Sequence, residues 1–275
     1  MTTGISLHIG LNRVDPNHYQ DEHGQPWDGQ LNACENDAKA MQALAQSRGF
    51  QTQLLLSAQA TADVAIHSIQ QAAQKLQPGD IFLLTYSGHG GQVPDRNDEE
   101  EDELDETWCL YDREVVDDEL YALWAQFKPG VRVLMLSDSC HSGTVAKDPN
   151  LMQIAAEQGV KIRALPLDVQ AATYRKHKKL YDGLQAANPA GDRVEVAASV
   201  VLISGCQDNQ SSYDGLENSK FTGKLLKVWN NGKFKGNLLR FKQRIAAEMP
   251  YYQSPNYFRV GTLNKEFEKQ RPFTI

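Results

Sequence analysis

The fold is decided by the stretch Asp80-Ile-Phe-Leu-Leu-Thr-Tyr-Ser-Gly-His-Gly-Gly91 and by its later counterpart Val131-Arg-Val-Leu-Met-Leu-Ser-Asp-Ser-Cys140. Each stretch begins with a nearly continuous apolar run, which is typical of a strand buried on both faces of a parallel sheet. Each then passes into small residues and one reactive side chain, His89 or Cys140. Because neighbouring parallel strands bring their carboxyl ends to the same sheet edge, the sequence predicts that His89 and Cys140 lie close together.

Strands and helices alternate along the rest of the chain. Short apolar runs predict further strands over residues 5–11, 52–56, 200–204 and 257–260. Apolar residues at three- and four-residue spacing predict helices over residues 32–48, 61–76, 118–127, 220–228 and 237–249. This alternation predicts an α/β fold in which helices cover both faces of a mostly parallel sheet.

Charge and composition exclude several classes of protein. The chain has 275 residues and a net charge of −7. Residues 95–119 hold 14 acidic and two basic residues, a net charge of −12, so the rest of the chain carries +5. That distribution argues against nucleic-acid binding, and no apolar run approaches the roughly 18–20 residues of a membrane span. No secretory signal precedes residue 5, which predicts a cytoplasmic protein with reduced thiols.

The pairing of a histidine with a cysteine indicates nucleophilic catalysis. A cysteine nucleophile needs a neighbouring imidazole to hold it as a thiolate and later to protonate a leaving amine. The backbone amides of Gly90 and Cys140 would then stabilise the oxyanion. His141 competes with His89 for the role of base, although an extended backbone would point it away from Cys140. Cys34, Cys109 and Cys206 form no Cys-x-x-Cys pair, so they are interpreted as structural residues and not as zinc ligands.

The segments Tyr86-Ser-Gly-His-Gly90 and Asp138-Ser-Cys-His-Ser-Gly143 resemble the catalytic motifs of metacaspases and of their prokaryotic relatives, the orthocaspases. Three further segments resemble motifs of the same family: Leu31-Asn-Ala-Cys-Glu-Asn-Asp-Ala38, Val116-Asp-Asp-Glu-Leu120 and Ile203-Ser-Gly-Cys-Gln-Asp-Asn-Gln210. The resemblance implies a caspase-like three-layer α/β/α sandwich around a six-stranded, mostly parallel sheet. It also implies one domain of three parts: a large-subunit-like part (1–145) with an acidic insertion (92–119), a linker (145–196) and a small-subunit-like part (197–275).

The resemblance further implies a monomeric cysteine endopeptidase that cleaves polypeptides after Arg or Lys through a thioacyl-enzyme, without an organic cofactor. The matching substrate-binding positions are Asp37, Asp138 and Ser87. The carboxylates of Asp37 and Asp138 suit a basic side chain, because a carboxylate can bind a guanidinium through two hydrogen bonds, and Ser87 would be a polar wall of the pocket. Two alternatives stay open at this point. One is a catalytically silent module that binds basic peptides, and the other is a legumain- or clostripain-like peptidase of the same clan.

Three interpretations of the acidic insertion also stay open. It could be a solvated loop, a calcium site or a partner for the basic linker. Resemblance to calcium-dependent metacaspases implies Asp105, Asp117, Asp118 and Asp148 as the calcium ligands. The linker carries the basic residues that self-processing would require, namely Lys147, Lys161, Arg163, Arg175, Lys176, Lys178 and Lys179. An enzyme specific for basic residues is therefore predicted to cut its own linker.

Overall fold

The computed structural model describes residues 2–97, 103–140, 161–207, 210 and 212–275. Its centre is a six-stranded sheet with the strand order β2-β1-β3-β7-β8-β9, in which every neighbouring pair is parallel except β8 and β9. The strands are β1 (Gly4–Gly10), β2 (Gln51–Leu56), β3 (Ile81–Ser87), β7 (Arg132–Asp138), β8 (Ser199–Ser204) and β9 (Asn256–Gly261). The predicted six-stranded, mostly parallel sheet is confirmed.

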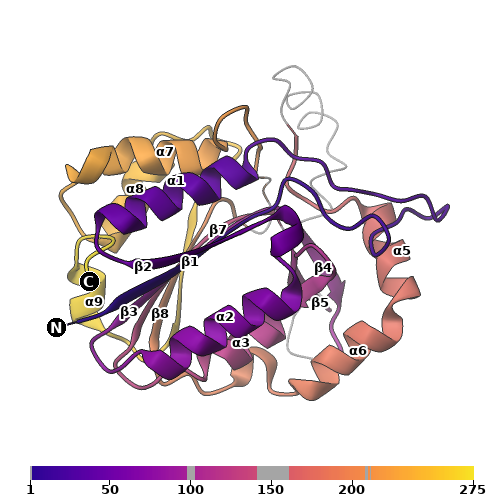
Figure 1. The fold of residues 1–275 in the computed structure, drawn as a ribbon, viewed down its shortest axis with the longest axis horizontal. Coiled ribbons are helices and arrows are strands. Elements are labelled where there is room, and N and C mark those ends of the chain that lie inside the picture. Colours follow the sequence, from indigo (N-terminus) through magenta and orange to yellow (C-terminus); the bar gives the residue numbers. More distant parts are fainter. Residues whose placement is uncertain (1, 98–102, 141–160, 208–209, 211) are drawn as a thin grey trace.

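Helices cover both faces of this sheet (Figure 1). One face carries α1 (Cys34–Ser47), α7 (Lys220–Trp229), α8 (Leu238–Ala246) and α9 (Lys265–Lys269). The other carries α2 (Ala62–Lys75) and α3 (Asp117–Trp124). A hydrophobic core lies on each face of the sheet, and successive residues of β3 point into opposite cores. Leu83 packs on the α1 side and Leu84 on the α2 side. The continuous apolar runs of the sequence therefore reflect burial on both faces.

Side chains that accept backbone hydrogen bonds mark where several helices begin. The side chain of Thr61 accepts a bond from the Val64 amide at the start of α2, as the sequence predicts. Ser219 does the same for α7 and Asn237 for α8. Each satisfies a donor that has no partner within its own helix.

The acidic insertion forms more structure than its charge suggests. It contributes a small antiparallel sheet of β4 (Gly90–Pro94), β5 (Leu104–Cys109) and β6 (Glu114–Val116). Val93, Trp108 and Val115 are buried in it. In the first half of β5 the buried positions are held by the polar residues Asp105 and Thr107, so the strand lacks the apolar alternation that would mark it in the sequence. Its described part is thus not a plain loop.

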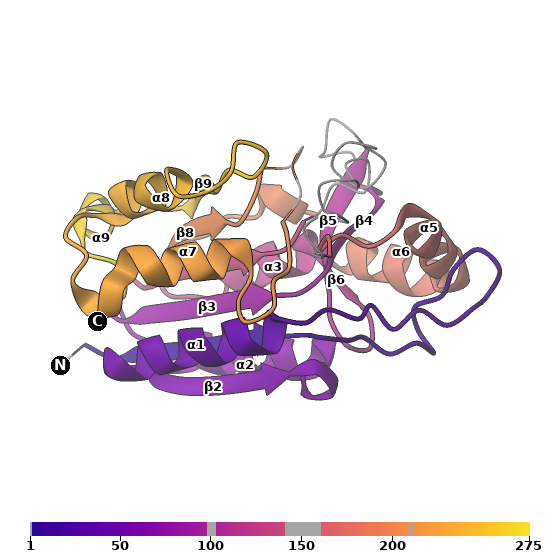
Figure 2. The same cartoon turned by 90° about the horizontal axis from the view of Figure 1, so that it is seen from above.

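The linker contains two helices that the sequence reading missed, α5 (Leu167–Lys176) and α6 (Lys178–Ala187). Tyr174 of α5 and Tyr181 of α6 pack against Val93 and Val116 of the insertion. Arg96 of the insertion also pairs with Asp182 of the linker at 3.4 Å, so in this ion pair the insertion supplies the basic residue and the linker the acidic one. Figure 2 shows α5 and α6 beside β4 and β5, at the end of the molecule toward which the parallel strands run.

A buried histidine makes the stability of this sheet depend on pH. His8 in β1 is fully buried between Thr85 and Ser6, with ring-to-hydroxyl distances of 2.9 Å to each. Burial lowers the pKa of His8 to about 3. The unfolded chain therefore binds a proton at His8 below about pH 6.5, while the folded chain does not, and acid favours unfolding.

We predict that His8 alone lowers the free energy of unfolding by roughly 2 kcal/mol when the pH falls from 7 to 5. Urea unfolding in a Cys140→Ala background measures this change. His8→Gln should remove that share of the pH dependence. His23→Gln, at an exposed position, should leave it unchanged. An equal pH dependence in all three chains would contradict the assignment.

Candidate active site

The pairing of β3 with β7 brings the two sequence motifs together. Ser87 and Asp138 are register partners at the ends of these strands. His89 and Cys140 each follow two residues later, at the same edge of the sheet. Both side chains are buried. The structure thus brings together the two residues that the sequence singles out for catalysis, whereas His141 lies outside the described residues.

The His89 ring is held in one orientation. Its Nε2 atom lies 2.9 Å from the carbonyl oxygen of Gly29, and Trp27 packs on the ring at 5.0 Å between centroids. A carbonyl only accepts, so Nε2 carries the proton of the neutral ring and Nδ1 is left with a lone pair. Gly29 has a φ of +58°, and a Cβ there would lie 2.8 Å from Trp27 and 3.2 Å from His89. Only glycine fits between the two rings.

Burial also sets the protonation state of this histidine. It lowers the pKa of His89 to about 4, although the backbone of Gly29 and that of Ala164 oppose the shift. The ring is therefore neutral at pH 7. A neutral ring with Nδ1 unprotonated can accept a proton from a thiol.

The site is filled by a residue of the chain itself, Arg163. Its carbonyl oxygen accepts hydrogen bonds from the Gly90 amide at 3.0 Å and from the Cys140 amide at 3.1 Å. These are the two amides that the sequence analysis assigns to the oxyanion. The Cys140 thiol donates to the carbonyl of Gln210 at 3.0 Å. The carbonyl carbon of Arg163 is thus polarised by two donors beside a cysteine.

The guanidinium of Arg163 is fully buried among carboxylates. Its Nη2 atom donates to Asp37 Oδ2 at 2.8 Å and to Asp214 Oδ1 at 2.9 Å. Its Nη1 atom donates to Ser87 Oγ at 2.7 Å and lies 3.2 Å from Asp138 Oδ2. The three substrate-binding residues implied by the resemblance therefore surround one basic side chain, together with Asp214.

Two of these carboxylates are held by the segment that leads into α7. Asp138 accepts bonds from the hydroxyls of Ser212, Ser219 and Thr222. Asp37 accepts bonds from the Asn218 side chain at 2.8 Å and from the Ser219 amide at 3.0 Å. Burial raises the pKa of Asp37, and the Arg163 guanidinium opposes that rise. Hydrogen bonds and one cation together offset the cost of burying the charges.

The backbone around Arg163 is bound like an added strand. The Arg163 amide donates to the Ser212 carbonyl at 3.0 Å, and the Asp214 amide donates to the Lys161 carbonyl at 2.8 Å. Beyond Arg163, the Leu165 amide donates to the Gly90 carbonyl at 2.7 Å. Main-chain bonds on both sides of a residue are how peptides are commonly held at a strand edge.

Sequence reasoning missed Asp214 and the role of Arg163 as an occupant. Asp214 also accepts bonds from the amides of Asn32 at 2.6 Å and Ala33 at 3.1 Å, which fixes the start of α1. Its signal in the sequence is weak. It stands four residues after the motif that ends at Gln210, and only the folded chain brings it to Asp37.

The structure describes three of the four residues implied as calcium ligands, namely Asp105, Asp117 and Asp118, and these three are not gathered into a group that could hold a metal ion. Asp105 and Asp118 are buried, and the Asn97 side-chain amide lies 3.3 Å from both Asp118 oxygens. No group of three or more acidic, histidine or cysteine side chains among the described residues could hold a metal ion. Asp148 lies outside the described residues. Calcium binding stays a prediction, and calcium titration of peptide hydrolysis, with a chelator as the reference, tests it.

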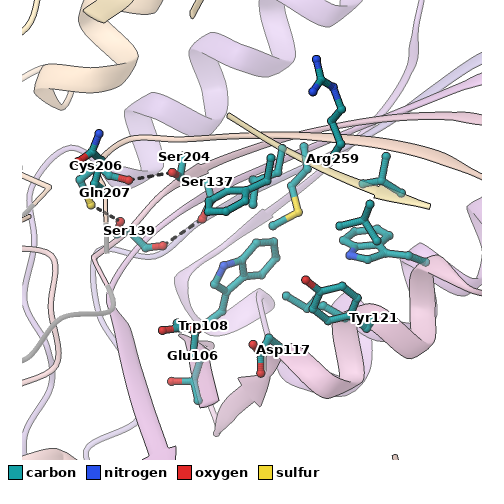
Figure 3. Close-up of a pocket in the computed structure, with 18 residues that line it drawn as sticks. Glu106, Trp108, Asp117, Tyr121, Ser137, Ser139, Ser204, Cys206, Gln207 and Arg259 are labelled. Atoms are coloured by element: carbon teal, nitrogen blue, oxygen red, sulfur yellow. Dashed lines mark hydrogen bonds between the residues drawn. The ribbon is translucent and has the colours of Figure 1, made fainter. Parts of the chain in front are cut away.

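A cavity of about 490 Å³ lies on the opposite face of the sheet from Arg163. Trp108, Tyr121 and Met135 line it between α3 and strands β7 to β9 (Figure 3). Near Cys140 it is bounded by Ser139 and Cys206, which are joined by a hydrogen bond from the Cys206 thiol to the Ser139 carbonyl. The cavity therefore touches the neighbours of Cys140 without including the bound arginine.

A histidine and a cysteine at the carboxyl edge of such a sheet, with two amides on one carbonyl oxygen, define a caspase-like cysteine hydrolase site. Residues 14–268 match the family profile described as Caspase domain. The chain belongs to this family of caspase-like cysteine peptidases, which confirms the family predicted from the motifs.

Individual relatives agree with this membership. Metacaspase-1 of Kluyveromyces lactis is 29% identical over 71% of this chain and 53% of its own length. Metacaspase-1B of Aspergillus fumigatus is 28% identical over 91% of this chain and 68% of its own length. The chain spans about half the length of the yeast relatives that it matches.

Solved structures support the fold. The crystal structure of protein GSU0716 from Geobacter sulfurreducens is 50% identical, with a TM-score of 0.87 over 99% of this chain and 98% of that chain. Caspase-1 from Spodoptera frugiperda has a TM-score of 0.53 at 9% identity over 95% and 88% of the two chains, a likeness of fold alone. No helix in the described part of the chain is long and apolar enough to cross a membrane.

We predict that Asp214→Asn lowers kcat/KM for a peptide with arginine before the scissile bond by roughly 10- to 100-fold, mainly through KM. Asparagine keeps an oxygen for the α1 amides but removes the charge that faces the guanidinium. Asp168→Asn, at an exposed position on α5, is the matched control and should leave both constants unchanged. An unchanged KM in Asp214→Asn would contradict this role.

Proposed function

We propose that this chain is a cysteine endopeptidase that cleaves polypeptides after arginine. The observation that carries the proposal is the placement of Arg163. Its carbonyl oxygen receives the Gly90 and Cys140 amides, and its guanidinium enters a pocket of carboxylates. A residue held at both its reacting carbonyl and its side chain is positioned as a substrate.

The proposed reaction uses Cys140 as nucleophile and His89 as acid and base. His89 Nδ1 takes the thiol proton while the sulfur attacks the arginine carbonyl carbon. The amides of Gly90 and Cys140 stabilise the resulting oxyanion. The protonated ring then gives its proton to the leaving amine, and a thioester remains on Cys140. Water activated by His89 hydrolyses the thioester and releases the arginine carboxylate.

The pocket favours arginine over lysine. Its hydrogen-bond acceptors bind two different nitrogens of the planar guanidinium. Asp37 and Asp214 accept from Nη2, and Ser87 accepts from Nη1. Lysine offers a single nitrogen on a shorter side chain and cannot serve both sets at once. Acceptors left without a donor inside a buried pocket are costly, so lysine substrates should be cleaved more slowly.

Self-processing at the Arg163–Ala164 bond follows from the same placement. Among the basic linker residues named above, Arg163 is the one whose carbonyl accepts the hydrogen bonds of the Gly90 and Cys140 amides. Arg175, Lys176, Lys178 and Lys179 belong to α5 and α6, where the backbone is helical and not extended. Lys161 lies two residues before Arg163, and Lys147 lies outside the described residues. A monomeric state and a cytoplasmic location stay predictions.

We predict that the wild-type chain hydrolyses a fluorogenic peptide with arginine before the reporter and that Cys140→Ala loses this activity. The reason is that Cys140, whose amide binds the Arg163 carbonyl, supplies the nucleophile in the proposed reaction. Cys109→Ala is the control, because it removes a buried thiol but keeps the backbone hydrogen bond from the Cys109 amide to the His89 carbonyl. Equal hydrolysis by Cys140→Ala would contradict the proposal. Peptide binding without hydrolysis by the wild type would favour the catalytically silent module.

We also predict that Arg163→Lys slows self-cleavage at this bond by about 10-fold or more, since it keeps the charge but loses hydrogen bonds to charged partners. Intact mass measured over time gives the rate. Arg175→Lys, at an exposed position, should cut at the wild-type rate. Wild-type cleavage kinetics in Arg163→Lys would exclude Arg163 as the processing residue.

A further inference from the structure

The segment that follows Arg163 is anchored independently of the bond that would be cut. Resting on the self-cleavage proposed above, we infer that the chain also rejoins its own cut. In this reaction the amine of Ala164 attacks the thioester on Cys140, which makes the enzyme an internal peptide ligase at the Arg163–Ala164 bond.

Leu165 provides the first anchor on the amine side. Its amide donates to the Gly90 carbonyl at 2.7 Å. Its side chain is fully buried in the core beneath α2 and α3, and it approaches Gly91 so closely that a Cβ there would lie 3.2 Å from it. None of these contacts involves Arg163, so cleavage leaves them in place.

Helix α5 provides the second anchor. The Gln92 amide of β4 donates to the Gln170 side chain at 3.0 Å. Val169 is buried in the main core, and Tyr174 packs on Val93. After cleavage, Ala164 would thus be a new chain end tethered one residue from a buried leucine and a few residues from a docked helix.

The other side of the cut is held as well. Arg163 keeps its carboxylate contacts and the bond from its amide to Ser212. The Lys161 carbonyl keeps the bond from the Asp214 amide. Both new ends therefore stay where the reaction took place. Two groups held in this way react with an effective concentration that can exceed about a hundred thousand molar.

The rejoining step is the reverse of acylation and balances without a co-reactant. The lone pair of the Ala164 amine attacks the thioester carbon, whose oxygen is held by the Gly90 and Cys140 amides. A carbon–nitrogen bond forms and the carbon–sulfur bond breaks. The amine proton passes to His89 Nδ1 and then to the departing sulfur. From the hydrolysed form, the Arg163 carboxylate and the Cys140 thiol take up one proton from solvent through His89, re-form the thioester and release one water.

The surroundings favour the amine over water. Ala164 is 6% exposed, and the side chains of Cys140 and His89 are buried beside it. Water therefore has little access to the thioester while the segment stays docked. An α-amine has an ordinary pKa of about 7.7–8.0, and burial favours its neutral, nucleophilic form.

Heavy-oxygen water tests the inference. The wild-type chain is incubated in it, and the peptide spanning residues 163 and 164 is analysed by mass spectrometry after digestion with a protease that cuts elsewhere. We expect a persistent intact fraction whose Arg163 carbonyl gains heavy oxygen, because repeated hydrolysis and rejoining pass the label into the bond. Cys140→Ala should take up no label.

The outcomes separate the two proposals. If cut chains carry heavy oxygen in the new carboxylate while the intact fraction disappears or stays unlabelled, the hydrolysed chain is not rejoined. The inference is then wrong, whereas the proposed self-cleavage is supported. If no chain is cut at this bond, the proposed self-cleavage fails, and rejoining fails with it.

Variants test whether the anchor is the cause. Leu165→Ala should lower the labelled intact fraction several-fold or more by loosening the amine end, whereas Leu216→Ala, at a position that is 85% exposed, should not. Gln170→Ala removes only the hydrogen bond from the Gln92 amide. It replaces Leu165→Ala as the anchor variant if that chain does not fold, and it should also lower the labelled intact fraction. Wild-type labelling in every folded anchor variant would overturn the argument.

Discussion

The buried ion pairs of Arg163 hold together parts of the chain that are distant in sequence. Asp37 lies on α1, Asp138 ends β7 and Asp214 precedes α7, and one guanidinium faces all three. Three carboxylates this deeply buried need a cation, since removing a partner from a buried pair leaves an uncompensated charge. The pocket proposed to select an arginine substrate is therefore filled by an arginine of the chain itself.

The sequence predicted the sheet and the His89–Cys140 pair because both depend on local patterns. Apolar runs such as that of β3 report burial on two faces, and the residues that follow them are fixed at the sheet edge. Asp214 and the seating of Arg163 could not be predicted in the same way. They depend on contacts between residues far apart in the chain, and neither residue type is distinctive in its own segment. Helices α5 and α6 were missed because few large apolar residues mark their buried positions, which include Ala172, Thr173 and Gln185. Strand β5 was missed because polar residues hold the buried positions of its first half.

The uneven charge of the chain acquires a structural meaning. The insertion, whose residues 95–119 have a net charge of −12, packs against the linker through apolar residues, with Val93 and Val116 facing Tyr174 and Tyr181. Its first strand, β4, begins at Gly90 and so contributes one of the two amides on the Arg163 carbonyl. The insertion thus connects the site to the helices that follow the proposed cut.

N-terminal sequencing of the carboxyl-terminal fragment of the self-cleaved wild type shows whether the chain binds its own Arg163–Ala164 bond as a substrate. We expect this fragment to begin at Ala164 and to be absent from Cys140→Ala. A fragment that begins at another residue, or one that forms equally in Cys140→Ala, would contradict it.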